Sequence, residues 1–253
     1  VLDDDEWNAI ESVLSKLDKP DTLVATTSNK RKFDTIHENN NNTSNDNNQC
    51  NVDPFKKTIA ASNNNNYQNK NSDATGPGLV DILPVQIDKD QKHGLEILFV
   101  GDNPGLQSNR EGHWYAHHSN HFWELLHKSG FTSVQLAPKN DTQAIKYGVG
   151  LTCLCKRASR TIDELSDQEL RDGFQTLLPK LRELRPKAVC FNGKKIYQIV
   201  TKSERCSFGL QPKKLDAGEG YTVPCFVIPS TSARVKTHSK EDKLAVMKQM
   251  KSF

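Results

Sequence analysis

The stretch VGDNPGLQSNREGHWYAHHSNHFW, residues 100–123, decides the fold because it joins a buried strand to a helix through a long polar and aromatic loop. The apolar run LEILFV at 95–100 predicts that strand, and residues 119–130 predict a helix capped by Ser119 or Asn120. The loop between them carries four histidines and several aromatic residues. Functional groups placed just beyond a buried strand are typical of α/β proteins, whose reactive residues gather at the carboxyl ends of the strands.

Strands and helices alternate along the rest of the C-terminal part. The sequence SDQE at 166–169 has capping-box form and predicts the start of an amphipathic helix that kinks near Pro179. The pattern further predicts strands at 188–191 and 223–228, and helices at 194–201 and 240–251. Such alternation predicts a three-layer α/β/α fold with a central, mainly parallel sheet.

The N-terminal third has a different composition. Its asparagine tracts account for much of the low hydrophobic content of 35% and the mean hydropathy of −0.69, and they cannot bury enough apolar surface to offset chain entropy. We therefore expect residues 19–85 to be disordered, behind a short amphipathic helix in residues 1–18. The predicted organisation is a mostly disordered region at 1–85 and a folded domain at 86–253.

Charge is distributed unevenly between these two parts. Residues 1–85 hold 8 Lys and Arg against 13 Asp and Glu, a net charge of −5, whereas residues 86–253 hold 26 against 18, a net charge of +8. A basic domain behind an acidic tail is compatible with a polyanionic partner, although a solvated lysine-rich surface explains the same charge. Charge alone does not decide between these interpretations.

The compartment is expected to be intracellular. The six cysteines form no C-x-x-C pair and are expected to stay reduced, and no apolar run approaches the roughly 20 residues of a membrane span. No signal peptide is visible, and Lys30-Arg31-Lys32 is either a nuclear-import signal or a chance basic triplet.

A second functional loop, PSTSAR at 229–234, leaves the strand predicted at 223–228. In the first loop, GDNPG at 101–105 predicts a tight turn with outward-pointing N–H groups. It is not a nucleotide-binding P-loop, because no Lys-Ser or Lys-Thr pair follows. Taken alone, Asn103 could be a simple turn former.

The order of these motifs resembles that of the mismatch-specific uracil/thymine DNA glycosylases. The matching pieces near the first loop are GDNPG at 101–105, GHWY at 112–115 and NHFW at 120–123. The later matching pieces lie at 129–131, 146–152, 191–194, 208–212 and 229–234. The resemblance implies a uracil-DNA glycosylase-like fold for residues 86–253 and leaves the preceding tail outside.

The resemblance also implies a function. The chain would be a monofunctional glycosylase that flips uracil, and thymine or other damaged bases, out of mismatched DNA and hydrolyses the N-glycosidic bond, which starts base excision repair. Its partner would be double-stranded DNA with G:U or G:T mismatches. We expect a monomer in the nucleus that needs no cofactor and no metal, so that activity survives EDTA.

Roles for individual residues follow from the same resemblance. Asn103 would position the attacking water, Tyr115 would stack on the extruded base, and N–H groups around Asp102 would bind the base oxygens. Arg234 would enter the duplex as a wedge. The segment before it, Ser230, Thr231, Ser232 and Ala233, would contact DNA through hydroxyl and N–H groups.

Several of these assignments have a plainer alternative. Tyr115 could be a core aromatic residue, and Asn120 could cap a helix as well as support the pocket. The Asp102 side chain could be idle or could act as a base, because the family more often has an apolar residue there. Cys153 stands where one branch of the family has an asparagine that reads the base, so base preference is the least transferable feature.

The chemistry of asparagine sets expectations for rate and for rival functions. Because an amide cannot act as a general base at neutral pH, Asn103 would only orient water, and uracil should leave faster than thymine. One rival is a DNA-binding adaptor that keeps the fold and has weakened catalysis. A phosphate hydrolase is a third possibility, but it would require a metal-binding carboxylate cluster that the sequence does not display.

Overall fold

The computed structural model of the chain describes residues 76–84 and 95–253. The helix expected in residues 1–18, and the tail up to residue 75, lie outside the described residues. The main sheet has five strands: β1 (Ile97–Gly101), β2 (Val149–Cys153), β3 (Ala188–Asn192), β4 (Gly209–Leu210) and β7 (Cys225–Ile228). They lie in the order β2-β1-β3-β7-β4, and all neighbours are parallel except β4 and β7. The predicted mainly parallel sheet is confirmed.

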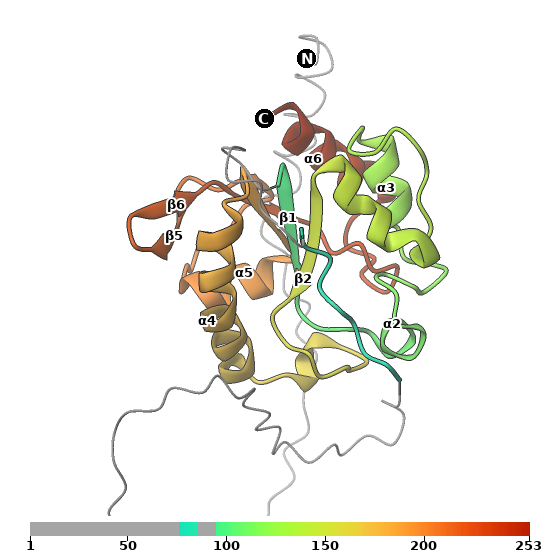
Figure 1. The fold of residues 1–253 in the computed structure, drawn as a ribbon, viewed down its shortest axis with the longest axis horizontal. Coiled ribbons are helices and arrows are strands. Elements are labelled where there is room, and N and C mark those ends of the chain that lie inside the picture. The colour runs from blue at the N-terminus through green and yellow to red at the C-terminus, as the bar shows by residue number, and fades with distance from the viewer. Residues whose placement is uncertain (1–75, 85–94) are drawn as a thin grey trace, which may run out of the picture. The chain divides into compact units, whose positions relative to one another are not determined.

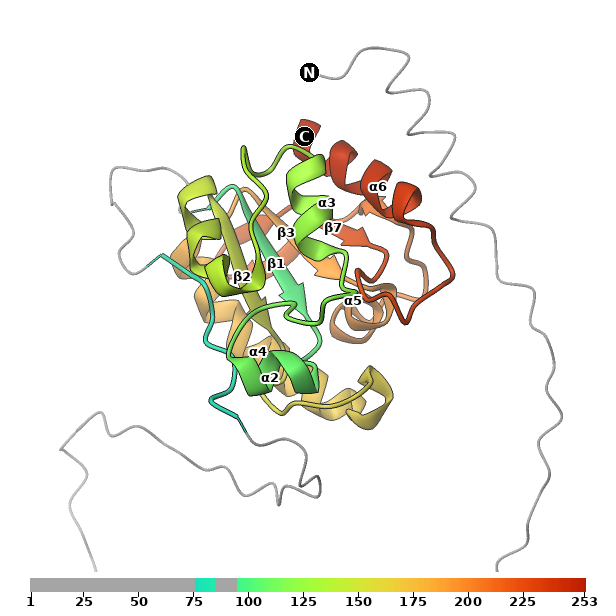
Figure 2. The ribbon, with the colours of Figure 1, turned by 90° about the vertical axis from the view of Figure 1, so that its right-hand side faces the viewer.

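Helices cover both faces of this sheet, as Figures 1 and 2 show. On one face lie α4 (Asp167–Leu184) and α5 (Lys194–Thr201), and on the other lie α3 (Phe122–Lys128) and α6 (Lys240–Ser252). Side chains alternate along β1, so that Phe99 packs in the core beneath α3 and α6, whereas Leu98 packs in the core beneath α4. This arrangement confirms the predicted three layers.

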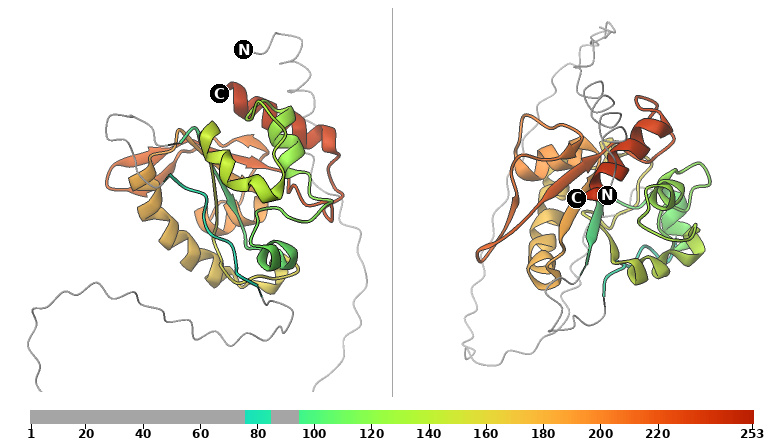
Figure 3. Two further views of the ribbon diagram at one scale, coloured as in Figure 1. Left: turned by 45° about the vertical axis from the view of Figure 1, so that its right-hand side comes forward. Right: turned by 90° about the horizontal axis from the view of Figure 1, so that it is seen from above.

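Shorter elements complete the described chain. They are α2 (Leu106–Glu111), the 3₁₀ segments η1 (Pro138–Tyr147) and η2 (Ile162–Glu164), and the hairpin strands β5 (Leu215–Gly218) and β6 (Tyr221–Val223). The hairpin projects beside α4, away from the main sheet (Figure 3).

The predicted capping box is confirmed, because the Ser166 hydroxyl accepts a hydrogen bond from the Glu169 N–H, and α4 runs through Pro179 as one helix. Two predicted element boundaries need adjustment. Helix α3 begins at Phe122, later than expected. The strand predicted at 223–228 is divided by Pro224, which has no N–H to donate, so that β6 ends before it and β7 begins after it.

Residues 76–84 correct one expectation, because they are packed against the folded domain although the sequence analysis placed them in the disordered region. Ile82 pairs with Leu151 on β2, each N–H donating to the other's carbonyl at 2.9 Å. Leu79 and Ile82 are both buried. This short apolar stretch lies beyond the asparagine tracts and can therefore bury surface that those tracts cannot.

The register of the strands brings their carboxyl ends to one edge of the sheet. Gly101 on β1 lies opposite Cys153 on β2, and Asn192 on β3 lies opposite Ile228 on β7. The loops that follow β1 and β7 therefore start at the same edge of the sheet, on either side of Asn192 at the end of β3. Far-apart segments of the sequence meet at this edge.

Candidate active site

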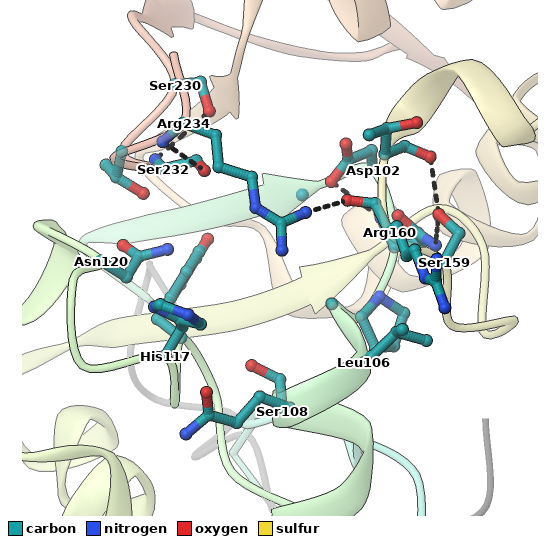
Figure 4. A pocket seen from close by; sticks show the side chains of 18 of the residues that line it. Asp102, Leu106, Ser108, His117, Asn120, Ser159, Arg160, Ser230, Ser232 and Arg234 are labelled. Atoms are coloured by element: carbon teal, nitrogen blue, oxygen red, sulfur yellow. Dashed lines mark hydrogen bonds between the residues drawn. The ribbon is translucent and has the colours of Figure 1, made fainter. Parts of the chain in front are cut away.

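A cavity of about 400 Å³ opens at this edge of the sheet. Figure 4 shows side chains from both strand-end loops converging on it. The residues predicted for the site that line the cavity are Asp102, Asn103, Tyr115, Asn120, Ser230, Thr231, Ser232, Ala233 and Arg234. Segments of the first loop, the region around η2 and the loop after β7 thus share one concave surface.

Asn103 is held in one orientation by its amide group. Its Nδ2 donates to the Arg157 carbonyl at 2.7 Å and to the Ser159 hydroxyl oxygen at 2.8 Å. Ser159 in turn donates its own proton to the Thr161 carbonyl at 2.7 Å, so its oxygen is free to accept. Because both hydrogens of the amide are used, Oδ1 is the atom that Asn103 can offer to a ligand or a water.

Asp102 lines the cavity next to Asn103. One carboxylate oxygen, Oδ1, accepts a hydrogen bond from the Asn103 N–H at 2.9 Å, and the Asp102 carbonyl accepts one from the Cys155 N–H at 2.8 Å. Burial raises the pKa of the Asp102 carboxyl above its usual value, although hydrogen bonds from backbone N–H groups oppose the shift. The Asn103 N–H is therefore occupied within the loop, and the expectation that N–H groups around Asp102 bind base oxygens stays a prediction for the other N–H groups there.

Tyr115 presents a ring to the cavity from a strained backbone. Its φ of 51° lies in the left-handed region, which is uncommon for residues other than glycine. The ring stacks on Phe122 with centroids 3.9 Å apart and an interplanar angle of 20°. Burial raises the pKa of the Tyr115 phenol, which therefore stays protonated. One ring face is taken by Phe122, and the residue still lines the cavity.

Asn120 lies just before α3, whose N-cap is His121, so the expected N-cap at Asn120 is not seen. Its Oδ1 accepts a hydrogen bond from the Phe122 N–H at 3.0 Å at the start of α3, and the residue also lines the cavity. Phe122 and Trp123 are buried in the core.

Asn192 is a site residue that the sequence analysis did not identify. Its Nδ2 donates to the Thr231 hydroxyl at 3.2 Å and to the Tyr115 hydroxyl at 3.4 Å, while its Oδ1 accepts from the Thr231 N–H at 3.1 Å. Asn192 therefore links the first loop, β3 and the loop after β7. Its place at the end of a buried strand, in the sequence FNGK at 191–194, was the signal that could have revealed it.

Thr231 lies inside the protein. It is fully buried, and both its N–H and its hydroxyl are paired with Asn192. This placement corrects the expectation that Thr231 contacts DNA, because DNA cannot reach a fully buried side chain. Ser230 and Ser232 are only half-buried and remain at the cavity surface.

Arg234 reaches across the cavity from the loop after β7 (Figure 4). Its Nη1 donates to the Arg160 carbonyl at 2.7 Å, which joins this loop to the segment before η2. Lys243 on α6 also holds this loop, because its Nζ donates to the carbonyls of Ser232 at 3.3 Å and Val235 at 3.4 Å. Lys243 is buried, and burial lowers its pKa.

Cys153 lies opposite Gly101 at the end of β2, near the Tyr115 hydroxyl. It is buried in the core on the α3 side of the sheet and does not line the cavity. Burial raises the pKa of its thiol to about 12, as expected for an unreactive core cysteine. The resemblance gave the position of Cys153 along the chain, but the pleat of β2 decides on which face of the sheet its side chain lies.

The described residues were also searched for other kinds of site. No group of three or more His, Cys, Asp or Glu side chains among them lies close enough to hold a metal ion. In the same part of the chain, no helix has the length and apolar character needed to cross a membrane.

The domain that contains this cavity matches a known protein family. A family model described as the uracil DNA glycosylase superfamily matches residues 89–251. The match includes all the predicted site residues and ends near the end of α6.

Proposed function

Because the chain belongs to the uracil DNA glycosylase superfamily and is thus a DNA glycosylase acting on uracil, we propose that it is a monofunctional enzyme specific for mismatched DNA. Its substrates would be G:U pairs and, more slowly, G:T pairs or other damaged bases. It would act as a monomer in the nucleus and start base excision repair there. A mispaired base costs less to extrude, which would favour mismatches over matched pairs.

One observation carries this proposal: Asn103, Tyr115 and Arg234 line the same cavity at the carboxyl edge of the sheet. The three groups correspond to the three tasks of a base-flipping hydrolase. An extruded base needs an aromatic face, the reacting sugar carbon needs an oriented water, and the vacated stack needs a side chain to fill it.

The proposed reaction uses Asn103 to orient water. Oδ1 of Asn103 accepts a hydrogen bond from the water, whose oxygen forms a bond to the sugar C1′. The C1′–N bond breaks, its electron pair leaves with the base, and the water's proton passes to solvent. Because the amide takes no proton, the rate depends on positioning and on the stability of the departing anion, so uracil should leave faster than thymine.

The decisive experiment measures cutting of a uracil-containing duplex at the abasic site after alkali treatment. The wild-type protein should cut G:U duplex, and Asn103→Ala should lower the single-turnover rate by about 10²-fold or more while DNA affinity stays within a factor of about two. Gln135→Ala, which removes an exposed amide outside the cavity, is the matched control and should cut at the wild-type rate.

Each outcome decides between the enzyme and its main rival. Binding of the duplex by the wild-type protein without cutting would establish the adaptor and overturn the proposal. Equal cutting by Asn103→Ala would remove Asn103 from its role. A panel of duplexes with U, T, hypoxanthine or ethenocytosine opposite each base then defines the base spectrum, and loss of cutting in EDTA would contradict the metal-free mechanism.

A further inference from the structure

Residues 76–84, which we call the pocket strap, lie before the region matched by the family model, yet they contact the candidate site. We propose that the pocket strap is part of the base-binding machinery. In this proposal Leu79 forms part of the cavity wall, and the strap holds Tyr115 in position. The role in base binding rests on the proposed function, whereas the contacts below support the position of the strap.

The strap approaches α2 very closely. The Gly78 N–H donates to the Asn109 carbonyl at 3.2 Å. A Cβ added at Gly76 would lie 2.4 Å from the Asn109 carbonyl oxygen, so only glycine permits this approach without a shift of the backbone. Because residues from the first half of α2 line the cavity, this contact fixes the strap relative to one cavity wall.

A second contact joins the strap to the aromatic loop. The Trp114 indole Nε1–H donates to the Val80 carbonyl at 2.8 Å. Trp114 is also fixed by its own N–H, which donates to Asp141 Oδ2 at 2.8 Å, and by its carbonyl, which accepts from Trp123 Nε1 at 2.9 Å. Tyr115 follows directly in the chain with a strained φ, so loosening Trp114 would release the ring from its position.

The far end of the strap is anchored to the sheet and to α4. Ile82 pairs with Leu151 on the outer strand β2. Asp81 forms ion pairs with Lys156 and with Lys180, the latter at 2.7 Å. These contacts hold the segment at both ends, with Leu79 and Val80 between the attachment points.

Leu79 is the strap residue that reaches the cavity. It lines the cavity, is only 9% exposed, and belongs to the same core as Trp114 and Phe122. Truncating it would leave a void behind the loop that carries Tyr115, and voids of this kind allow neighbouring side chains to shift. We therefore expect the effect of truncation to appear in the chemical step.

The test compares Leu79→Ala with Val134→Ala in the full chain. Val134 is 50% exposed and lies outside the strap and the cavity, so its truncation controls for loss of an apolar side chain. Leu79→Ala should lower the single-turnover rate on G:U duplex by about tenfold, with DNA affinity within a factor of about two. Leu79→Met, which conserves volume, should restore most of the rate, and Val134→Ala should match the wild type.

A second measurement does not depend on catalysis. The indole N–H of Trp114 should exchange with deuterium faster in Leu79→Ala than in the wild type, as followed by NMR, and at the wild-type rate in Val134→Ala. Should Leu79→Ala fail to fold, Asp81→Asn, which weakens the ion pairs of the strap, should show the same faster exchange and a reduced excision rate.

The outcomes separate the two proposals. If the wild-type protein releases no uracil, the proposed function fails, while the indole exchange still decides whether the strap holds the aromatic loop. Unchanged excision and unchanged indole exchange in Leu79→Ala would overturn the strap proposal. A loss confined to DNA affinity or to thermal stability, with the rate of the bound complex intact, would overturn it as well.

Discussion

The two loops that form the cavity are fixed to the protein in different ways. The loop after β1 is anchored along its length, through the Asn103 amide, the Trp114 main chain and the stacked ring of Tyr115. The loop after β7 is anchored near its start by buried Thr231 and by Lys243 on α6. Its end is exposed, with the Arg234 guanidinium bonded to one carbonyl, that of Arg160.

This difference separates two tasks. A rigid first loop presents a preformed surface to a base, which lowers the ordering cost of binding. An exposed arginine on a firmly rooted second loop can exchange one hydrogen bond for contacts with DNA. We therefore expect changes in the first loop to affect every substrate, and changes at the tip of the second loop to affect duplex substrates only.

The largest effect in this comparison is expected for Tyr115→Ala in the first loop. Stacking of a base on an aromatic ring contributes about 1–3 kcal/mol, so excision should fall about 5- to 150-fold. The fall should be similar on duplex and on single-stranded DNA that contains uracil, because the base stacks on the ring in both. Tyr115→Phe keeps the ring and loses only the long 3.4 Å hydrogen bond from Asn192, and should stay near the wild-type rate.

Arg234→Ala tests the second loop and should have a smaller effect. Excision from G:U duplex should fall about tenfold, because the vacated stack is no longer filled, while excision from single-stranded DNA should not change. The measurement compares single-turnover rates of Arg234→Ala and the wild type on G:U duplex and on single-stranded DNA. An equal loss on both would mean that Arg234 supports the cavity itself, and the distinction between the loops would be lost.

The smallest effect concerns an ion pair that connects the helices behind the two loops. Glu124 on α3 pairs with Lys240 at the start of α6 and with Lys128, both at 2.7 Å. Hydrogen bonds from these two lysines lower the pKa of Glu124 to about 2 from its usual 4.5. The pair therefore stabilises the fold fully above about pH 4.5, and this contribution is lost as the pH falls through about 2.

Because Glu124 is near the surface, we expect its contribution to the free energy of unfolding to stay below about 1 kcal/mol. Glu124→Gln should reduce stability slightly at pH 7 and reduce its dependence on pH between 4.5 and 2. Denaturant unfolding at several pH values measures this. An unchanged pH dependence in Glu124→Gln would show that the ion pairs of Glu124 with Lys128 and Lys240 do not stabilise the fold.

Local sequence patterns predicted much of the fold and the position of the site. The apolar run before Gly101 and the capping box at Ser166 gave correct elements, because strand burial and helix capping depend on neighbouring residues. The two strand-end loops were located for the same reason. Asn192 and the partners of Asn103 were not found, because their contacts join residues 39 to 77 positions apart.

The errors have equally specific causes. Cys153 was placed by its order along the chain, and its burial depends on the pleat and on the register with Gly101. Thr231 looked like a surface hydroxyl in PSTSAR, and only the pairing with Asn192 draws it inside. Residues 76–84 were assigned to the tail because they are short and follow polar tracts, while their partner β2 lies about 70 residues further along.

The pairing of Ile82 with Leu151 also bears on how the protein behaves at high concentration. Strand β2 is the outermost strand on its side of the sheet, and an uncovered outer strand offers its main-chain groups to any other chain. Ile82 occupies two of those groups, and the opposite border is formed by β4, which is only two residues long. Both borders of the sheet are therefore poor templates for pairing with a strand of another chain.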